Sequence, residues 1–211
     1  SIGLALPLGV SQAWGSVLFS CLSSLQITQE QAAWLGFSMT MSGCLGSVIV
    51  GALLDRFAGC LKLVTVGLMG LAAASFCLFS ANAAGGLGLS HRGAISAAYV
   101  TGISGGAALN ISVPLMFEMI METLYGWADE GIGAMLSVFL NTVVQIIFLL
   151  ILSASDADAS HLWTAWLTAA SMAACCGALL CLRVQYRRLA VDRGTTISEA
   201  GCYFDRAVGC Y

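Results

Sequence analysis

The sequence has little charge. Only 9% of its 211 residues are Asp, Glu, Lys or Arg, whereas 59% are hydrophobic and the mean hydropathy is +0.90. A soluble domain carries about 25% charged residues, which it needs to cover its outside. The composition therefore predicts an integral membrane protein and excludes intrinsic disorder. With eight Lys and Arg residues and a net charge of −3, it also excludes a nucleic-acid partner.

Motifs that hold metals or perform catalysis are lacking as well. None of the nine cysteines forms a CxxC pair or a Cys/His zinc spacing, and six of them lie inside apolar runs, where free Cys behaves as a small hydrophobe. No HExxH, GxSxG or pair of catalytic carboxylates occurs, and His91 and His161 fall in loops without ligand partners. We therefore expect no metal site, no cofactor, no structural disulfide and no enzymatic activity.

Long apolar runs are what the sequence does contain. A helix needs about 20 apolar residues to cross the bilayer core, and six stretches qualify: residues 2–22, 32–54, 63–79, 94–120, 132–153 and 162–182. They predict an all-α membrane protein with six transmembrane helices in one bundle over residues 1–182, followed by a polar tail at residues 183–211. The chain starts at Ser1 without a basic segment before the first run, which is typical of an internal start rather than a signal peptide.

Basic residues give the expected orientation of the bundle. Arg56, Lys62 and the arginines of the tail fall on the side that holds both chain ends, and only Arg92 falls on the opposite side. Short loops rich in Lys and Arg stay in the cytosol. We therefore expect a cytosolic start and a cytosolic C-terminal tail.

Several polar or amphipathic side chains lie near the middle of predicted spans: Gln12 and Trp14 in the first, Asn110 in the fourth, and Asn141 and Gln145 in the fifth. An amide in hydrocarbon costs several kcal/mol unless it finds partners. Amides at one depth on three helices predict a hydrated cavity near the midplane, where transporters bind their substrates. The alternative is that the amides join neighbouring helices by hydrogen bonds and that the tryptophan is packing.

The fourth span carries a second polar feature. Asn110, Pro114 and Glu118 are spaced by four residues and so share a helix face. Pro114 has no N–H, which frees the carbonyl of Asn110 and bends the helix. Carboxylates inside membranes commonly serve proton relays, so Glu118 is the candidate for proton coupling. A gate-closing or packing contact near the headgroups is the alternative for Glu118.

Small residues recur every four positions on two spans, at Gly43, Ser47 and Gly51 and at Gly102 and Gly106. In lipid, small residues let helix backbones approach closely. We therefore expect these positions to mark helix–helix contacts, with a substrate passage as the alternative.

The loop after the second span contains Gly51, Asp55, Arg56 and Gly59. This spacing resembles the Gly-x-x-x-Asp-Arg-x-Gly signature of the major facilitator superfamily, with one residue added before the last glycine. In that role Gly51 allows close helix contact, Asp55 faces a helix N-terminus, and Arg56 with Lys62 holds the loop at the cytosolic face. An ordinary positive-inside loop would explain the charges but not the spacing of Gly51 and Asp55.

The segment after Asn110 resembles solute carrier family 49, the feline leukaemia virus subgroup C receptor group. The tenth helix of that family and the loop after it carry Pro-x-x-x-Glu-x-x-x-Glu, then Tyr-Pro and Glu-Gly. The matching residues here are Pro114, Glu118, Glu122, Tyr125, Glu130 and Gly131. Gly126 replaces the family's proline, and one residue is inserted before Glu130. The similarity covers nearly all of residues 1–192 and implies helices seven to twelve, the C-terminal half of a twelve-helix major facilitator carrier; residues 193–211 resemble nothing in the family.

The resemblance implies secondary transport of a small organic solute by alternating access. Proton-coupled pyridoxine transport in the lysosomal membrane is the favoured activity, and choline, ethanolamine or haem transport, or a plasma-membrane location, is the alternative. Trp14 would stack on a pyridine ring or lie over a quaternary cation, and the amides would bind hydroxyls. Asn141 and Gln145 match an Asn-x-x-x-Gln pattern of the choline-handling members.

The partners implied are therefore a small-molecule solute, membrane lipid, protons and a missing N-terminal half of the same carrier. A rival from another class is a non-transporting membrane receptor, or a truncated half-carrier that only binds partners. In such a protein, substituting Asn141 would leave its behaviour unchanged.

Overall fold

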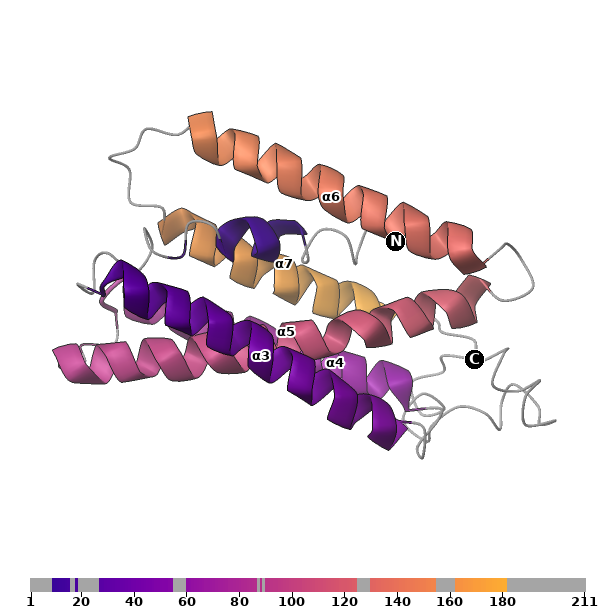
Figure 1. The fold of residues 1–211 in the computed structure, drawn as a ribbon, viewed down its shortest axis with the longest axis horizontal. Coiled ribbons are helices and arrows are strands. Elements are labelled where there is room, and N and C mark those ends of the chain that lie inside the picture. The colour runs from indigo at the N-terminus through magenta and orange to yellow at the C-terminus, as the bar shows by residue number, and fades with distance from the viewer. Residues whose placement is uncertain are drawn as a thin grey trace.

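The computed structural model describes residues 9–15, 18, 27–54, 60–86, 88, 90–124, 130–154 and 162–181. Its long elements are the helices α3 (Gln29–Leu54), α4 (Leu61–Ala83), α5 (His91–Leu124), α6 (Glu130–Ala154) and α7 (Leu162–Cys181), and residues 9–15 form a short helical segment before them (Figure 1). The expectation of an all-α protein is confirmed for the described residues. All five long helices are long and apolar enough to cross a membrane. The first expected span, residues 2–22, lies largely outside the described residues and stays a prediction.

Most helices extend beyond the apolar runs that predict them, because polar residues continue or cap them. At the start of α3, the backbone N–H of Thr28 donates to Gln31 Oε1 over 3.1 Å, and the Gln31 N–H donates to Thr28 Oγ1 over 3.3 Å. This reciprocal pair is a capping box. At the end of α4, Asn82 Nδ2 donates to the carbonyl of Ala94 over 2.7 Å and joins α4 to the first turns of α5.

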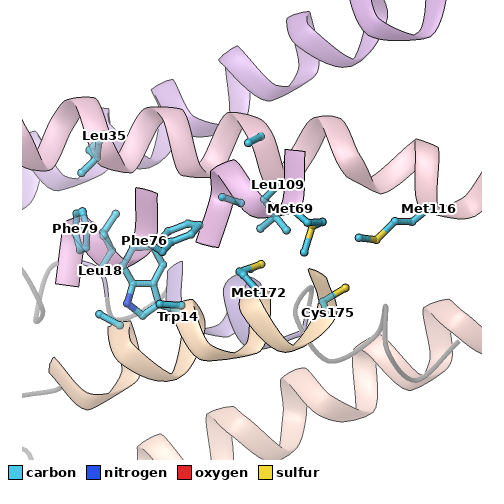
Figure 2. Close-up of a cluster of buried hydrophobic side chains, with 14 of the residues drawn as sticks. Trp14, Leu18, Leu35, Met69, Phe76, Phe79, Leu109, Met116, Met172 and Cys175 are labelled. Atoms are coloured by element: carbon cyan, nitrogen blue, oxygen red, sulfur yellow. The ribbon is translucent and has the colours of Figure 1, made fainter. Parts of the chain in front are cut away.

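The core lies where α4 packs against α5 and α7. Its large buried side chains are Met69, Phe76 and Phe79 of α4, Leu109 and Met116 of α5, and Met172 and Cys175 of α7 (Figure 2). Segment 9–15 joins this core to α6, because Trp14 enters the core while Val10 and Ala13 pack against Phe148 and Leu152 of α6.

Two helices leave wide apolar faces uncovered. The exposed side chains of α3 include Trp34, Leu45 and Val48, and those of α6 include Met135 and Phe139. Such surface area is stable only against lipid or another protein. The chain is therefore a multi-pass integral membrane protein.

A seam of glycines joins α3 to α5. A Cβ added at Gly102 would lie 3.3 Å from Leu35, and one added at Gly106 would lie 2.7 Å from Met39. One turn further on, the glycine lies on α3 and the side chain on α5, since a Cβ at Gly43 would overlap Asn110. The expected packing role is thus confirmed for these three glycines. A Cβ at Gly51, in contrast, would meet nothing within 4 Å among the described residues, so its role in close helix contact stays a prediction.

One expectation about the cysteines is wrong. Cys60, directly before α4, is disulfide-bonded, whereas Cys44, Cys77, Cys175, Cys176 and Cys181 are free. The free cysteines lie inside the helices, where a thiol behaves as an apolar group. Cys60 lies outside the apolar runs, so that argument does not apply to it.

Candidate functional site

A pocket of about 220 Å³ lies between segment 9–15 and the helices α3, α4 and α5. It is lined by Ser11, Gln12, Trp14, Gly15, Leu18, Gly36, Met39, Thr40, Phe76, Gly106, Leu109 and Asn110. Three of the five predicted binding residues are therefore brought together here, from two separate elements. No Asp, Glu, Lys or Arg belongs to this lining, so the described walls are neutral.

Trp14 forms an inner wall of the pocket and is only 1% exposed. Its indole meets the rings of Phe76 and Phe79 edge to face, with centroid distances of 5.4 Å and interplanar angles of 86° and 87° (Figure 2). Aromatic pairs favour this arrangement. Packing thus fixes the orientation of the indole, while its Nε1 is buried without a hydrogen-bond partner among the described residues.

Asn110 lies on α5 at the glycine seam. Its Nδ2 donates to the carbonyl of Gly106 over 2.9 Å, which satisfies one N–H within its own helix. The amide still has a second N–H and the lone pairs of Oδ1 with which to bind a ligand. The helix continues without interruption through Pro114, four residues later.

Asn141 does not line the pocket but contacts Gln12, which does. Its Nδ2 lies 3.4 Å from Gln12 Oε1, and its own Oδ1 is buried without a partner among the described residues. Gly9 allows α6 to come this close, because a Cβ there would lie 2.8 Å from the Asn141 carbonyl oxygen. Gln145 is half-buried one turn further along α6 and is not part of the pocket lining.

The other predicted residues lie away from the pocket or outside the described residues. Glu118 is half-buried on α5, two turns after Asn110, and Glu122 is buried one turn later. Asp55 and Arg56 lie outside the described residues. The structure therefore leaves the proton-coupling and loop-motif assignments as predictions.

Lys62 has a different position from the one expected. The sequence places it in a cytosolic loop, but it lies in the first turn of α4 with 0% of its surface exposed. Its Nζ donates to the carbonyl of Leu180, in the last turn of α7, over 3.5 Å. The negative end of the α7 dipole favours a cation here, so Lys62 joins α4 to α7 instead of marking a loop.

Several pocket residues were not predicted from the sequence. Met39 and Thr40 of α3, Phe76 of α4 and Leu109 of α5 all line the pocket. Each lies in a continuous apolar span, where the sequence does not show which side chains face a cavity and which face lipid. Within such a span, only polar side chains indicate a cavity. The hydroxyl of Thr40 is a weak indication, because its Oγ1 donates to the carbonyl of Gly36 in its own helix.

Comparison with known proteins finds relatives that share one name. No protein-family model matches the chain. The chain is 31% identical over 192 residues to solute carrier family 49 member 4 homolog of Xenopus tropicalis, and 30% identical over the same length to the protein of that name from Xenopus laevis. The aligned region is 90% of this chain but 41% of each relative, so the chain spans about two fifths of their length.

Proposed function

Since this chain belongs to solute carrier family 49, we propose that it is the C-terminal half of a twelve-helix major facilitator carrier that moves a small organic solute by alternating access. The observation that carries this proposal is the pocket between segment 9–15, α3, α4 and α5, lined by Gln12, Trp14 and Asn110. Carriers bind their solutes at such sites between helices, near the middle of the membrane.

The polar groups of the site support a bound solute. Trp14 Nε1 is a buried donor and Asn141 Oδ1 a buried acceptor, both without partners among the described residues. An unmade hydrogen bond of this kind costs about 1–3 kcal/mol. A hydroxylated solute that reached these groups would recover part of that cost, and Gln12 next to Asn141 would add a further amide.

Size and charge favour pyridoxine among the candidate solutes. Pockets for drug-sized ligands measure about 300–1,000 Å³, and this one, at about 220 Å³, suits a single substituted ring better than haem. Its described walls carry no cation to pair with the carboxylates of haem. Choline is the second candidate, because the indole of Trp14 could lie against a quaternary ammonium group.

Proton coupling and location complete the proposal. Glu118 is the half-buried carboxylate on the same helix as Asn110 and is the candidate coupling group in this half. The uncovered faces of α3 and α6 would meet the N-terminal half and lipid. Gly51, Asp55 and Arg56 would stabilise one conformational state. We place the carrier in the lysosomal membrane, with its C-terminal tail in the cytosol.

Uptake measurements test this function. Cells would express the full-length carrier at the plasma membrane, and uptake of labelled pyridoxine and choline would be measured at acidic and neutral external pH. We expect acid-stimulated pyridoxine uptake that falls at least about tenfold in Trp14→Phe, which loses the indole N–H and one ring. Trp166→Phe, at an exposed tryptophan of α7 outside the pocket, is the matched control. Choline uptake that ignores pH would favour the second candidate, and uptake of neither solute would favour a non-transporting receptor.

A further inference from the structure

Glycines form an unusual share of the pocket wall, at Gly15, Gly36 and Gly106. Gly106 belongs to the helix seam, since a Cβ there would press on Met39. The other two glycines have free space in front of them. A Cβ at Gly15 would meet no described atom within 4 Å, and one at Gly36 would have Leu18 Cδ2 as its nearest neighbour, at 3.9 Å.

Among the described residues, neither backbone geometry nor helix packing requires glycine at these two positions. The glycines with positive φ among the described residues are Gly85 and Gly88, so Gly15 and Gly36 adopt conformations open to any residue. Glycine inside a helix is less favourable than alanine. An alanine would therefore fit both positions and strengthen both helices, and what it would remove is space in the pocket.

We propose that Gly15 and Gly36 are specificity-determining residues that set the upper size limit of the transported solute. This inference rests on the proposed transport function and concerns the same pocket. Gly15 lies in the short segment and Gly36 on α3, so the two glycines widen the pocket from two different elements. A methyl group has about the volume of one water molecule, roughly 30 Å³, which is about one seventh of a pocket of about 220 Å³.

The size limit predicts a graded and selective effect. In Gly36→Ala the added methyl group would occupy space that the ring substituents of pyridoxine need, and in Gly36→Val the isopropyl group would fill still more. A smaller ring would not reach the added groups. One methylene of misfit changes discrimination roughly tenfold or more, so we expect a loss of that order for the larger solute alone.

The experiment uses the full-length carrier with pyridoxine and 3-hydroxypyridine, which lacks the methyl and both hydroxymethyl groups of pyridoxine. We expect Gly36→Ala and Gly15→Ala each to raise the KM for pyridoxine about tenfold, and Gly36→Val to abolish uptake. The inhibition constant of 3-hydroxypyridine, measured against pyridoxine uptake, should stay within about twofold of the wild-type value in the alanine variants. Surface abundance is measured for each variant, so that a loss of protein is separated from a loss of affinity.

Gly67→Ala and Gly177→Ala are matched controls, because a Cβ at either glycine meets no described atom within 4 Å and neither glycine lines the pocket. If pyridoxine uptake in the wild type is intact and the pocket variants behave like these controls, the size limit is wrong while the transport function stands. An equal loss of affinity for pyridoxine and for 3-hydroxypyridine would also overturn the size limit. Absence of pyridoxine uptake in the wild type removes the proposed function and the size limit with it.

Discussion

Asn141 and Gln12, separated by 129 positions in the chain, lie side by side with Nδ2 and Oε1 3.4 Å apart. This pair joins α6 to the segment that forms one wall of the pocket. Elsewhere α6 leaves much of its apolar surface uncovered, with Met135 and Phe139 as examples. The amide pair therefore marks the point at which α6 and the candidate site meet.

Substituting either amide should impair transport. We expect Asn141→Ala and Gln12→Ala each to lower pyridoxine uptake about tenfold, with the double variant little worse than either alone, because the two side chains act together. Such interhelical pairs in membranes contribute only about 0.6–1.7 kcal/mol to stability, so surface abundance should change little. Thr142→Ala is the control, since Thr142 is exposed and bonds its own helix. Unchanged uptake in Asn141→Ala would show that the amide pair takes no part in transport.

The glycine seam should be sensitive to single methyl groups. Gly43→Ala and Gly106→Ala would force side chains of the neighbouring helix to move, and overpacking of this kind costs about 1–3 kcal/mol. Thermal unfolding of the purified carrier in detergent measures the effect. Gly67→Ala, at an open position of α4, should not lower the melting temperature. Equal stability of all three variants would contradict the close α3–α5 contact.

Removing the charge of Lys62 should loosen the contact between α4 and α7. Lys62→Met keeps most of the buried side-chain volume but loses the ammonium group that donates to Leu180. A cation at a partly buried helix C-terminus is worth up to about 2 kcal/mol, so we expect a stability loss of about 1–2 kcal/mol. Thermal unfolding of the same preparation measures it. Lys62→Arg keeps the charge and should lose less stability. If Lys62→Met is as stable as the wild type, the hydrogen bond to Leu180 adds nothing to the stability.

Glu118 should control the response to pH. A carboxamide cannot release a proton, so Glu118→Gln is expected to reduce the ratio of pyridoxine uptake at acidic and neutral pH to about one while leaving pH-independent uptake. Glu30→Gln changes an exposed carboxylate in the first turn of α3 and is the matched control. An intact acid response in Glu118→Gln would assign proton coupling to a group outside this half.

Hydropathy predicts much of this fold, because a membrane helix must be apolar over most of its length. It misses the helix ends, where the Thr28–Gln31 capping box and the Asn82 side chain act through hydrogen bonds. The burial of Lys62 is missed for a related reason, since it donates to a backbone carbonyl on a helix over a hundred residues away.

The candidate site was predictable only in its polar part. Gln12 and Asn110 stand out because amides are costly in lipid, whereas Met39 and Phe76 look like any other apolar residue of a span. Which face of a helix turns toward a cavity depends on how all the helices pack. The pairing of Trp14 with Phe76 and Phe79 is a property of that packing and has no local signal in the sequence.

The glycine seam also determines which helices can shift relative to each other. The contacts repeat every four residues on both helices. Leu35 of α3 packs on Gly102 of α5, Met39 on Gly106, and Asn110 of α5 on Gly43 of α3. A slide of α3 by one turn, about 5.4 Å, would set Met39 against Asn110 in one direction and open a gap between two glycines in the other. The register between α3 and α5 is therefore locked. We therefore expect a change in pocket shape to come from movement of the other lining elements, segment 9–15 or α4, against that pair.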